Sequence, residues 1–136
     1  MQAGHARNDD TNGAEAEGAS WIESNVVDGV RQSASDAYLT PAAGRVNLTV
    51  VACAHVQRLI IDHTTCRGVE YIVDGHGERS FADREVILCA GAIGSPQLLL
   101  LSGIGPGQHL RDLGLDVVAD VPGVGAAVEV KGNTYI

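Results

Sequence analysis

A tight turn of small residues joins an apolar run to a helix signal and holds the best candidates for chemistry. Glu85–Cys89 is short and almost wholly apolar, and Ala90–Gly94 follows it. Ser95 is a good helix cap and Pro96 a good first helical residue. Small residues between a buried strand and a helix N-terminus allow backbone N–H groups to face a ligand, and anionic cofactors dock at such places. The pattern predicts a nucleotide-binding crossover without naming the cofactor.

Two other glycine clusters are weaker candidates for binding a dinucleotide. Gly103–Gly107 follows a helix rather than a strand, so we predict that it is a helix-stop turn. Gly123–Val128 follows a predicted strand, but no helix and second strand complete a βαβ unit after it. An NAD-binding module built on Gly123 and Gly125 is therefore only a lesser alternative.

The cysteines, histidines and serines form no recognisable reactive cluster. Cys53, Cys66 and Cys89 are widely spaced and odd in number, which argues against a disulfide framework or a zinc site. The five histidines show no metal-ligand spacing, and Gly94-Ser95-Pro96 is not a nucleophile elbow. We therefore predict neither a metal site nor a catalytic residue in this chain.

The elements that must position the turn are predicted to be several strands and short helices. Strands are expected at six places: 21–30, 47–51, 56–61, 69–73, 85–89 and 117–121. Asp74–Gly77 is a hairpin turn signal. The run at 85–89 suits a strand that is buried on both faces of a parallel sheet.

Helices are expected from Ser33, over 97–102 with a stop at Gly103, and over 108–113 with a stop at Gly114. The first helix should be short, because Pro41 disfavours a helical conformation of the preceding Thr40. Helices and strands together predict a mixed α/β domain.

Composition narrows the class of protein. The 136 residues are 45% apolar and carry a formal net charge of −8, which suits one domain with its own core. A negative surface repels phosphate, so we expect no nucleic-acid partner. No apolar run approaches the roughly 20 residues that span a bilayer. No signal-peptide pattern is visible either, so we expect no membrane span and a cytoplasmic location.

The residues from Gly91 to Gly105 carry a far more specific signal. Their sequence, Gly-Ala-Ile-Gly-Ser-Pro-Gln-Leu-Leu-Leu-Leu-Ser-Gly-Ile-Gly, resembles the second signature of the glucose–methanol–choline oxidoreductases at every constrained position. Flanking segments such as Tyr38–Pro41, Asn47–Val50 and Asp120–Gly125 are similar to the choline-dehydrogenase-like branch, in the same order and at similar spacing. The resemblance covers residues 8–125.

This resemblance implies a fold, a cofactor and a reaction. It implies part of a Rossmann-like FAD-binding domain with an inserted antiparallel β-meander. In that family an alcohol gives a hydride to flavin N5 while a histidine takes its proton. The backbone of Val56 is implied to meet the adenine, and the backbones of Ala90 and Gly91 to lie near the adenosine half of FAD. The implied substrate is a small alcohol, choline-like or another primary alcohol.

The chain departs from the family pattern at both ends. The Gly-x-Gly-x-x-Gly phosphate loop and the segment with the catalytic histidine are absent, and residues 126–136 diverge from the family. We therefore expect an internal fragment that lacks catalysis on its own. Residues 1–32 would be the edge of a substrate-side region, 33–125 a partial FAD-binding domain and 126–136 a divergent tail.

The alternative is a truncated, non-enzymatic product that needs a partner chain. Without the first βαβ unit, one edge of the parallel sheet would be uncovered. Exposed apolar sheet surface recruits partners or aggregates. Complementary segments of the family fold would complete the domain in either case.

Overall fold

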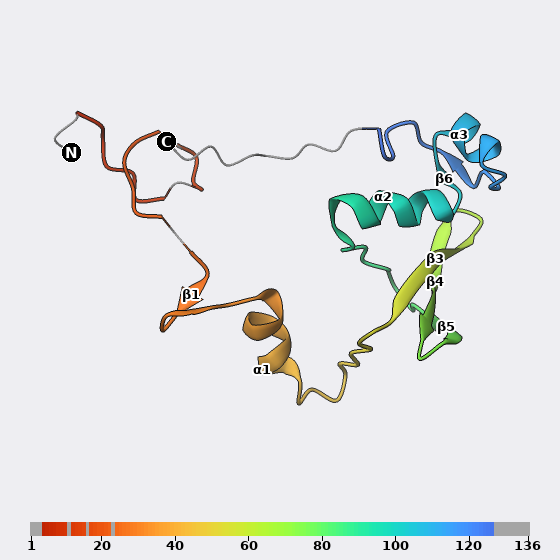
Figure 1. Cartoon of the computed structure of the whole chain (residues 1–136), viewed down its shortest axis with the longest axis horizontal. Coiled ribbons are helices and arrows are strands. Elements are labelled where there is room, and N and C mark those ends of the chain that lie inside the picture. Colours follow the sequence, from red (N-terminus) through yellow and green to blue (C-terminus); the bar gives the residue numbers. More distant parts are fainter. Residues whose placement is uncertain (1–3, 11, 16, 23, 127–136) are drawn as a thin grey trace. The chain divides into compact units, whose positions relative to one another are not determined.

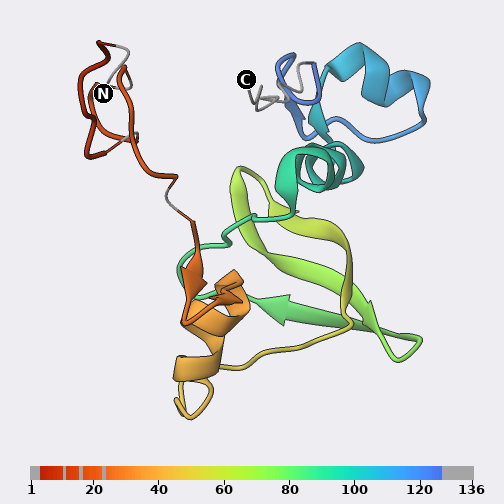
Figure 2. The same cartoon turned by 60° about the vertical axis from the view of Figure 1, so that its left-hand side comes forward.

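The computed structural model describes residues 4–10, 12–15, 17–22 and 24–126, so the tail predicted at 126–136 lies outside these ranges except for Ala126. The chain divides into two units, residues 1–50 and 51–136. Figure 1 and Figure 2 show the elements of each unit from two sides. Within the described ranges, no helix combines the length and the apolar character needed to cross a membrane. The predicted domain boundaries stay predictions.

The first unit contains a minimal hairpin. β1 (Val26–Val27) pairs antiparallel with β2 (Val30–Arg31) across the turn Asp28–Gly29. Both turn residues have a positive φ, 51° and 78°, as a two-residue turn that follows the strand twist requires. The strand predicted over 21–30 is therefore reduced to two residues before this turn.

A short helix follows the hairpin, made of a π-helical turn η1 (Ser35–Leu39) and α1 (Thr40–Ala42). The Ser33 hydroxyl accepts the Asp36 N–H at 3.1 Å, and the Ser33 N–H donates to the Asp36 carboxylate at 3.0 Å. This reciprocal cap confirms the helix start predicted at Ser33. The expectation that Thr40 is not helical is wrong. A widened turn, in which the Thr40 N–H reaches Ser35 O, precedes the proline and makes room for its ring.

The second unit is built around an antiparallel meander. β3 (His55–Asp62), β4 (Thr65–Val73) and β5 (His76–Phe81) form one sheet in the order β3-β4-β5. The predicted strands at 56–61 and 69–73 are confirmed, as is the turn after β4, where Asp74 and Gly75 have φ of 50° and 77°. The strand predicted at 47–51 is wrong: it pairs with no described residue, so its β-branched side chains alone do not make a strand.

Helix α2 (Gly91–Leu101) follows the meander and confirms the predicted helix body. It begins earlier than expected, so Pro96 lies inside the helix and Ser95 is not its N-cap. The Ser95 hydroxyl instead accepts the Ala90 N–H at 3.1 Å, closing the turn before the helix.

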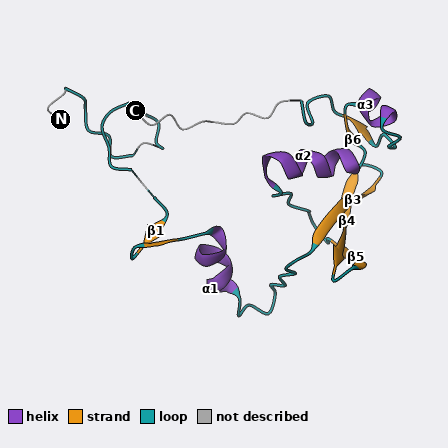
Figure 3. Cartoon of the chain, viewed as in Figure 1, coloured by secondary structure: helices purple, strands orange, loops and turns teal. Residues whose placement is uncertain are grey.

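The strand predicted at 85–89 is not formed. Figure 3 draws the connection between β5 and α2 as loop, and no strand pairs with it among the residues that the structure describes. A parallel strand has ladder bonds only where a neighbouring strand supplies them. The apolar run is present here without such a neighbour.

The last elements form a small parallel unit. β6 (Ile104–Gly105) pairs in parallel with β7 (Ala119–Asp120), and α3 (Gly107–Asp112) connects them. The helix predicted at 108–113 and its stop at Gly114 are confirmed, and the strand predicted at 117–121 is shortened to two residues. The Gly107 N–H donates to the Asp120 carboxylate at 2.8 Å, which fixes β7 to the start of α3.

The glycine after α2 confirms the predicted helix stop. Gly103 has a φ of 81°, and a Cβ there would lie 2.4 Å from the Asp116 carbonyl oxygen. Only glycine fits this left-handed, close-packed position. Gly103–Gly107 is thus a turn and a short strand rather than a phosphate loop. The other candidate, Gly123–Val128, begins in a turn and ends outside the described residues.

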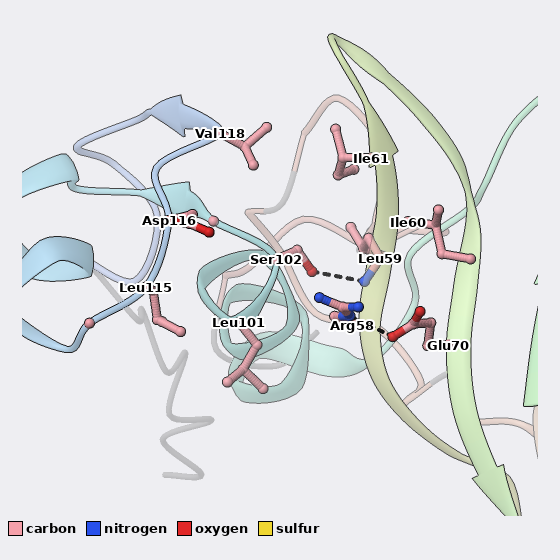
Figure 4. A pocket seen from close by; sticks show the side chains of 12 residues that line it. Arg58, Leu59, Ile60, Ile61, Glu70, Leu101, Ser102, Leu115, Asp116 and Val118 are labelled. Carbon is pink, nitrogen blue, oxygen red and sulfur yellow. Dashed lines mark hydrogen bonds and ion pairs between the residues drawn. The ribbon is translucent and has the colours of Figure 1, made fainter. Parts of the chain in front are cut away.

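Few apolar side chains of the described part are buried. Leu110 is fully buried and Leu59 retains 8% exposure. The buried Ser102 links helix and sheet. Its hydroxyl accepts the Leu59 N–H at 2.8 Å (Figure 4), and it donates to Leu98 O at 2.5 Å. This pair of bonds fixes the end of α2 against the outer edge of β3.

We expect Ser102→Ala to lower the free energy of unfolding by about 1–3 kcal/mol, because it leaves the Leu59 N–H buried without a partner. Urea denaturation followed by circular dichroism measures the change. Ser80→Ala is the matched control. Its exposed hydroxyl makes only a 3.5 Å contact with Tyr71, so the expected loss is below about 0.5 kcal/mol. Equal stability of the two variants would contradict the assigned role of Ser102.

Candidate functional site

A cavity of about 320 Å³ lies between the start of β3 and one face of α2. One wall comes from residues 54–57 and the other from Ala90 and the α2 residues Gly94, Gln97, Leu98 and Leu101. Two of the residues singled out by sequence, Val56 and Ala90, line this same cavity. The third, Gly91, is the first residue of α2 and directly follows Ala90, but it is not part of the lining.

The cavity lies beside an edge of the sheet with which no described strand pairs. β3 is the outer strand of the meander, and its edge faces α2, because the Leu59 N–H reaches Ser102 there. An edge strand offers backbone donors and acceptors that no neighbouring strand uses. Val56 therefore lies where a ligand can meet its backbone.

The lining combines apolar walls with a few polar groups. Its walls are largely aliphatic, and the amides of Gln57 and Gln97 and the ring of His55 supply polar groups. None of the nine described lining residues is acidic, although the whole chain is. Ligand pockets run from about 300 to 1,000 Å³ and combine apolar walls with a few polar groups. The cavity is at the lower end of this range and fits a group of nucleobase size better than a whole dinucleotide.

The turn before α2 is closed by its own hydrogen bonds. The Ala90 N–H donates to Ser95, and as the N-cap residue Ala90 gives its carbonyl to the first helical bond. A Cβ on Gly94 would lie 3.2 Å from the Ala90 methyl group, so small residues keep this corner tight. Sequence analysis found the small residues but missed this use of Ser95, since a hydroxyl that reaches back five residues has no separate sequence signal.

A second cavity, of about 350 Å³, is lined by residues that include both Leu59 and Ser102 (Figure 4). Arg58 and Glu70 come from its sheet wall, and Leu115, Asp116 and Val118 from the segment before β7. The cavity wall thus contains a strong charge pair. The chemistry of the cavity depends on whether these two side chains are free to contact a ligand.

The charge pair belongs to the sheet. Arg58, Glu70 and Arg79 are direct neighbours across β3, β4 and β5. Glu70 lies 2.5 Å from the Arg58 guanidinium and 2.7 Å from that of Arg79. The hydrogen bond from Arg58, with the positive charge of both arginines, lowers the pKa of Glu70 below its ordinary value. A carboxylate held this way is a poor base, so we interpret the triad as a cross-strand clamp.

No cluster of three histidine, cysteine or acidic side chains that could hold a metal ion occurs over the part of the chain that the structure describes. All three cysteines are free thiols.

The lowered pKa of Glu70 predicts a pH dependence of stability. Its ionised form stabilises the fold above about pH 4.3, the ordinary glutamate pKa, and this contribution is lost as the pH falls through the lower pKa of the folded state. Glu70→Gln removes the contribution. Wild type should be more stable than this variant at pH 7, and the difference should shrink steadily below pH 4. Urea denaturation across the pH range measures it, with Glu78→Gln as control. A pH-independent difference would contradict the clamp.

Comparison with known proteins gives a consistent result. A family model described as GMC oxidoreductase matches residues 1–131. Human mitochondrial choline dehydrogenase is 44% identical over the whole chain, and the oxygen-dependent choline dehydrogenase of Rhizobium johnstonii is 46% identical over 98% of it. These matches cover 23% and 24% of the two relatives, so the chain spans about a quarter of their length.

Solved structures agree with the sequence comparison. The pyridoxine 4-oxidase of Mesorbium loti has a TM-score of 0.78 at 38% identity, covering 89% of this chain and 24% of that one. An FAD-dependent oxidoreductase from Chaetomium thermophilum has a TM-score of 0.59 at 32% identity, covering 62% of this chain and 15% of that one. Backbone and sequence thus point to the same family.

Proposed function

The chain belongs to the GMC oxidoreductase family, and from this premise we propose that it is part of an FAD-dependent enzyme that oxidises the CH–OH group of a choline-like alcohol. The family membership and the fold class predicted from residues 91–105 are confirmed. The named relatives are choline dehydrogenases, which supports the substrate class. The cytoplasmic location stays a prediction, and the name of the human relative places that protein in mitochondria.

The cavity between β3 and α2 is proposed to hold the adenosine half of FAD. The observation that carries this is that Val56 and Ala90, distant in sequence, line one cavity of nucleobase size. Val56 would meet the base with backbone atoms on the open edge of β3. Ala90 and Gly91 would contact the adenosine from the turn, and the absence of acidic groups from the described lining suits an anionic ligand.

The chain's own contribution would be to bind and orient the cofactor. FAD, when bound, supplies the ring that accepts the hydride from the alcohol. Ser95 keeps the turn closed through its bond to Ala90, and Ser102 keeps α2 against β3, so both serines would act as positioning residues for the cavity.

The adenosine assignment predicts that ADP competes with FAD for the purified chain while FMN does not, because FMN lacks the adenosine half. Flavin fluorescence during titration and competition measures this. Gly94→Leu should weaken FAD and ADP binding by about tenfold or more by filling the cavity wall. Gly44→Leu, at an open position in the other unit, should bind like wild type. Equal competition by FMN and ADP would overturn the assignment.

We further propose that the 136-residue chain has no alcohol-oxidising activity by itself. The chain spans about a quarter of the length of its relatives, and none of its histidines matches the catalytic histidine that the family resemblance implies. Purified chain with FAD, choline and an artificial electron acceptor should reduce the acceptor no faster than free FAD does. Protein-dependent turnover that is abolished by Gly94→Leu would contradict this.

A further inference from the structure

The cavity of about 350 Å³ beside the end of α2 has charged groups on two of its walls. Arg58 comes from the sheet wall and Asp116 from the segment before β7. Figure 4 shows these two side chains on either side of Ser102. The adenosine assignment uses a different cavity, so this space is a separate candidate for ligand binding.

Both charged groups keep hydrogen-bonding capacity for a ligand. Arg58 binds Glu70 through Nε, and none of the described residues accepts a bond from its two terminal amino groups. The Asp116 carboxylate likewise has no ion pair with a described side chain. The Ser102 hydroxyl is already engaged in two bonds, so polar recognition falls to Arg58 and Asp116.

The charges on the two walls have opposite signs. Glu70 lies between Arg58 and Arg79, and two positive charges with one negative charge leave this triad positive. Asp116 is negative and belongs to the other wall. Asp116 repels a simple anion and the triad repels a simple cation. A molecule that carries both charges, one at each end, meets a complementary group at both walls.

The rest of the lining selects the body of such a molecule. It is mostly aliphatic: Leu59, Ile60, Ile61, Leu101, Leu115 and Val118. None of the described lining residues is aromatic, so a quaternary ammonium would find no ring face, whereas a primary ammonium can donate hydrogen bonds to Asp116. The volume is at the lower end of the range of about 300–1,000 Å³ for ligand pockets. These features favour a short hydrocarbon chain.

We propose that this cavity binds a short linear aliphatic zwitterion with its ammonium and carboxylate at opposite ends, the class of the ω-amino acids. The terminal amino groups of Arg58 hold the carboxylate, Asp116 holds the ammonium, and the aliphatic side chains pack against the methylene chain. The inference goes beyond the proposed function and does not depend on FAD binding.

A ligand series on the wild-type chain tests the charge arrangement. Isotope-labelled chain is titrated with ε-aminocaproate and followed by NMR, and we expect saturable binding with a Kd at or below about 1 mM. Caproate and hexylamine each lack one of the charges and should bind about tenfold more weakly or worse. Norleucine is an isomer of ε-aminocaproate with both charges at one end, and it should be weakened similarly. Equal binding of the two isomers, or no saturable binding of ε-aminocaproate, would overturn the proposal.

The same spectra locate the ligand. Amide shifts should concentrate at Ser102 and residues 114–118, which border this cavity. Shifts centred on Ala90 and Gly94 would place the ligand in the adenosine cavity and contradict the assignment. Binding of ε-aminocaproate by a chain that does not bind ADP would support this site and count against the adenosine assignment. Binding of ADP without ε-aminocaproate would do the reverse.

A charge-removing variant tests the role of Asp116. Asp116→Asn keeps the shape of an exposed side chain without an ion pair, so circular dichroism should be unchanged. Binding of ε-aminocaproate should fall by about tenfold or more, while binding of caproate, which has no ammonium, should not weaken. Asp83→Asn, an exposed carboxylate outside the cavity, is the matched control and should stay within about threefold of wild type. Equal weakening of both ligands by Asp116→Asn, or of neither, would refute the assigned role.

Discussion

One buried hydrogen bond determines how the parts of the second unit meet. The Ser102 hydroxyl accepts a hydrogen bond from the Leu59 N–H at the outer edge of β3. It also donates a hydrogen bond to the carbonyl of Leu98 in the last turn of α2. With so few buried apolar side chains in the described part, this polar contact fixes the helix where hydrophobic packing alone would leave it loosely held. Both partners of that contact also line the cavity of about 350 Å³ beside the end of α2.

The Arg58–Glu70–Arg79 clamp does the same for the meander. Three charged side chains on neighbouring strands lock the register of a sheet whose faces are largely exposed. A one-residue slip would separate the charges and move every side chain to the opposite face. The charge pairs thus hold the three strands in register, in a sheet that buries few apolar side chains.

Local signals in the sequence predicted local structure well. Each correct prediction depends on backbone geometry within a few residues, so the local sequence is enough to make it. These predictions are the Asp28–Gly29 and Asp74–Gly75 turns, the Ser33 cap and the Gly103 stop. The strands expected at 47–51 and 85–89 failed because strand formation needs a distant partner that residue type does not provide.

At the candidate site too, the local feature was predicted from the sequence and the long-range pairing was not. Composition and periodicity led to the turn at Ala90 but could not place Val56 beside it. That pairing came from the family resemblance, and the structure brings the two residues to one cavity. Their contact with FAD stays a prediction. The role of Ser95 was missed because its bond to Ala90 depends on where α2 begins.

That bond has a consequence for how any ligand would be held. With its N–H given to Ser95 and its carbonyl to the helix, Ala90 has both backbone groups engaged before a ligand arrives. The wall is preorganised, so little conformational entropy remains to be lost there on binding. A base beside Ala90 would meet a rigid methyl surface, and its selectivity would come from shape and from the amides of Gln97 on the same wall and Gln57 on the opposite one.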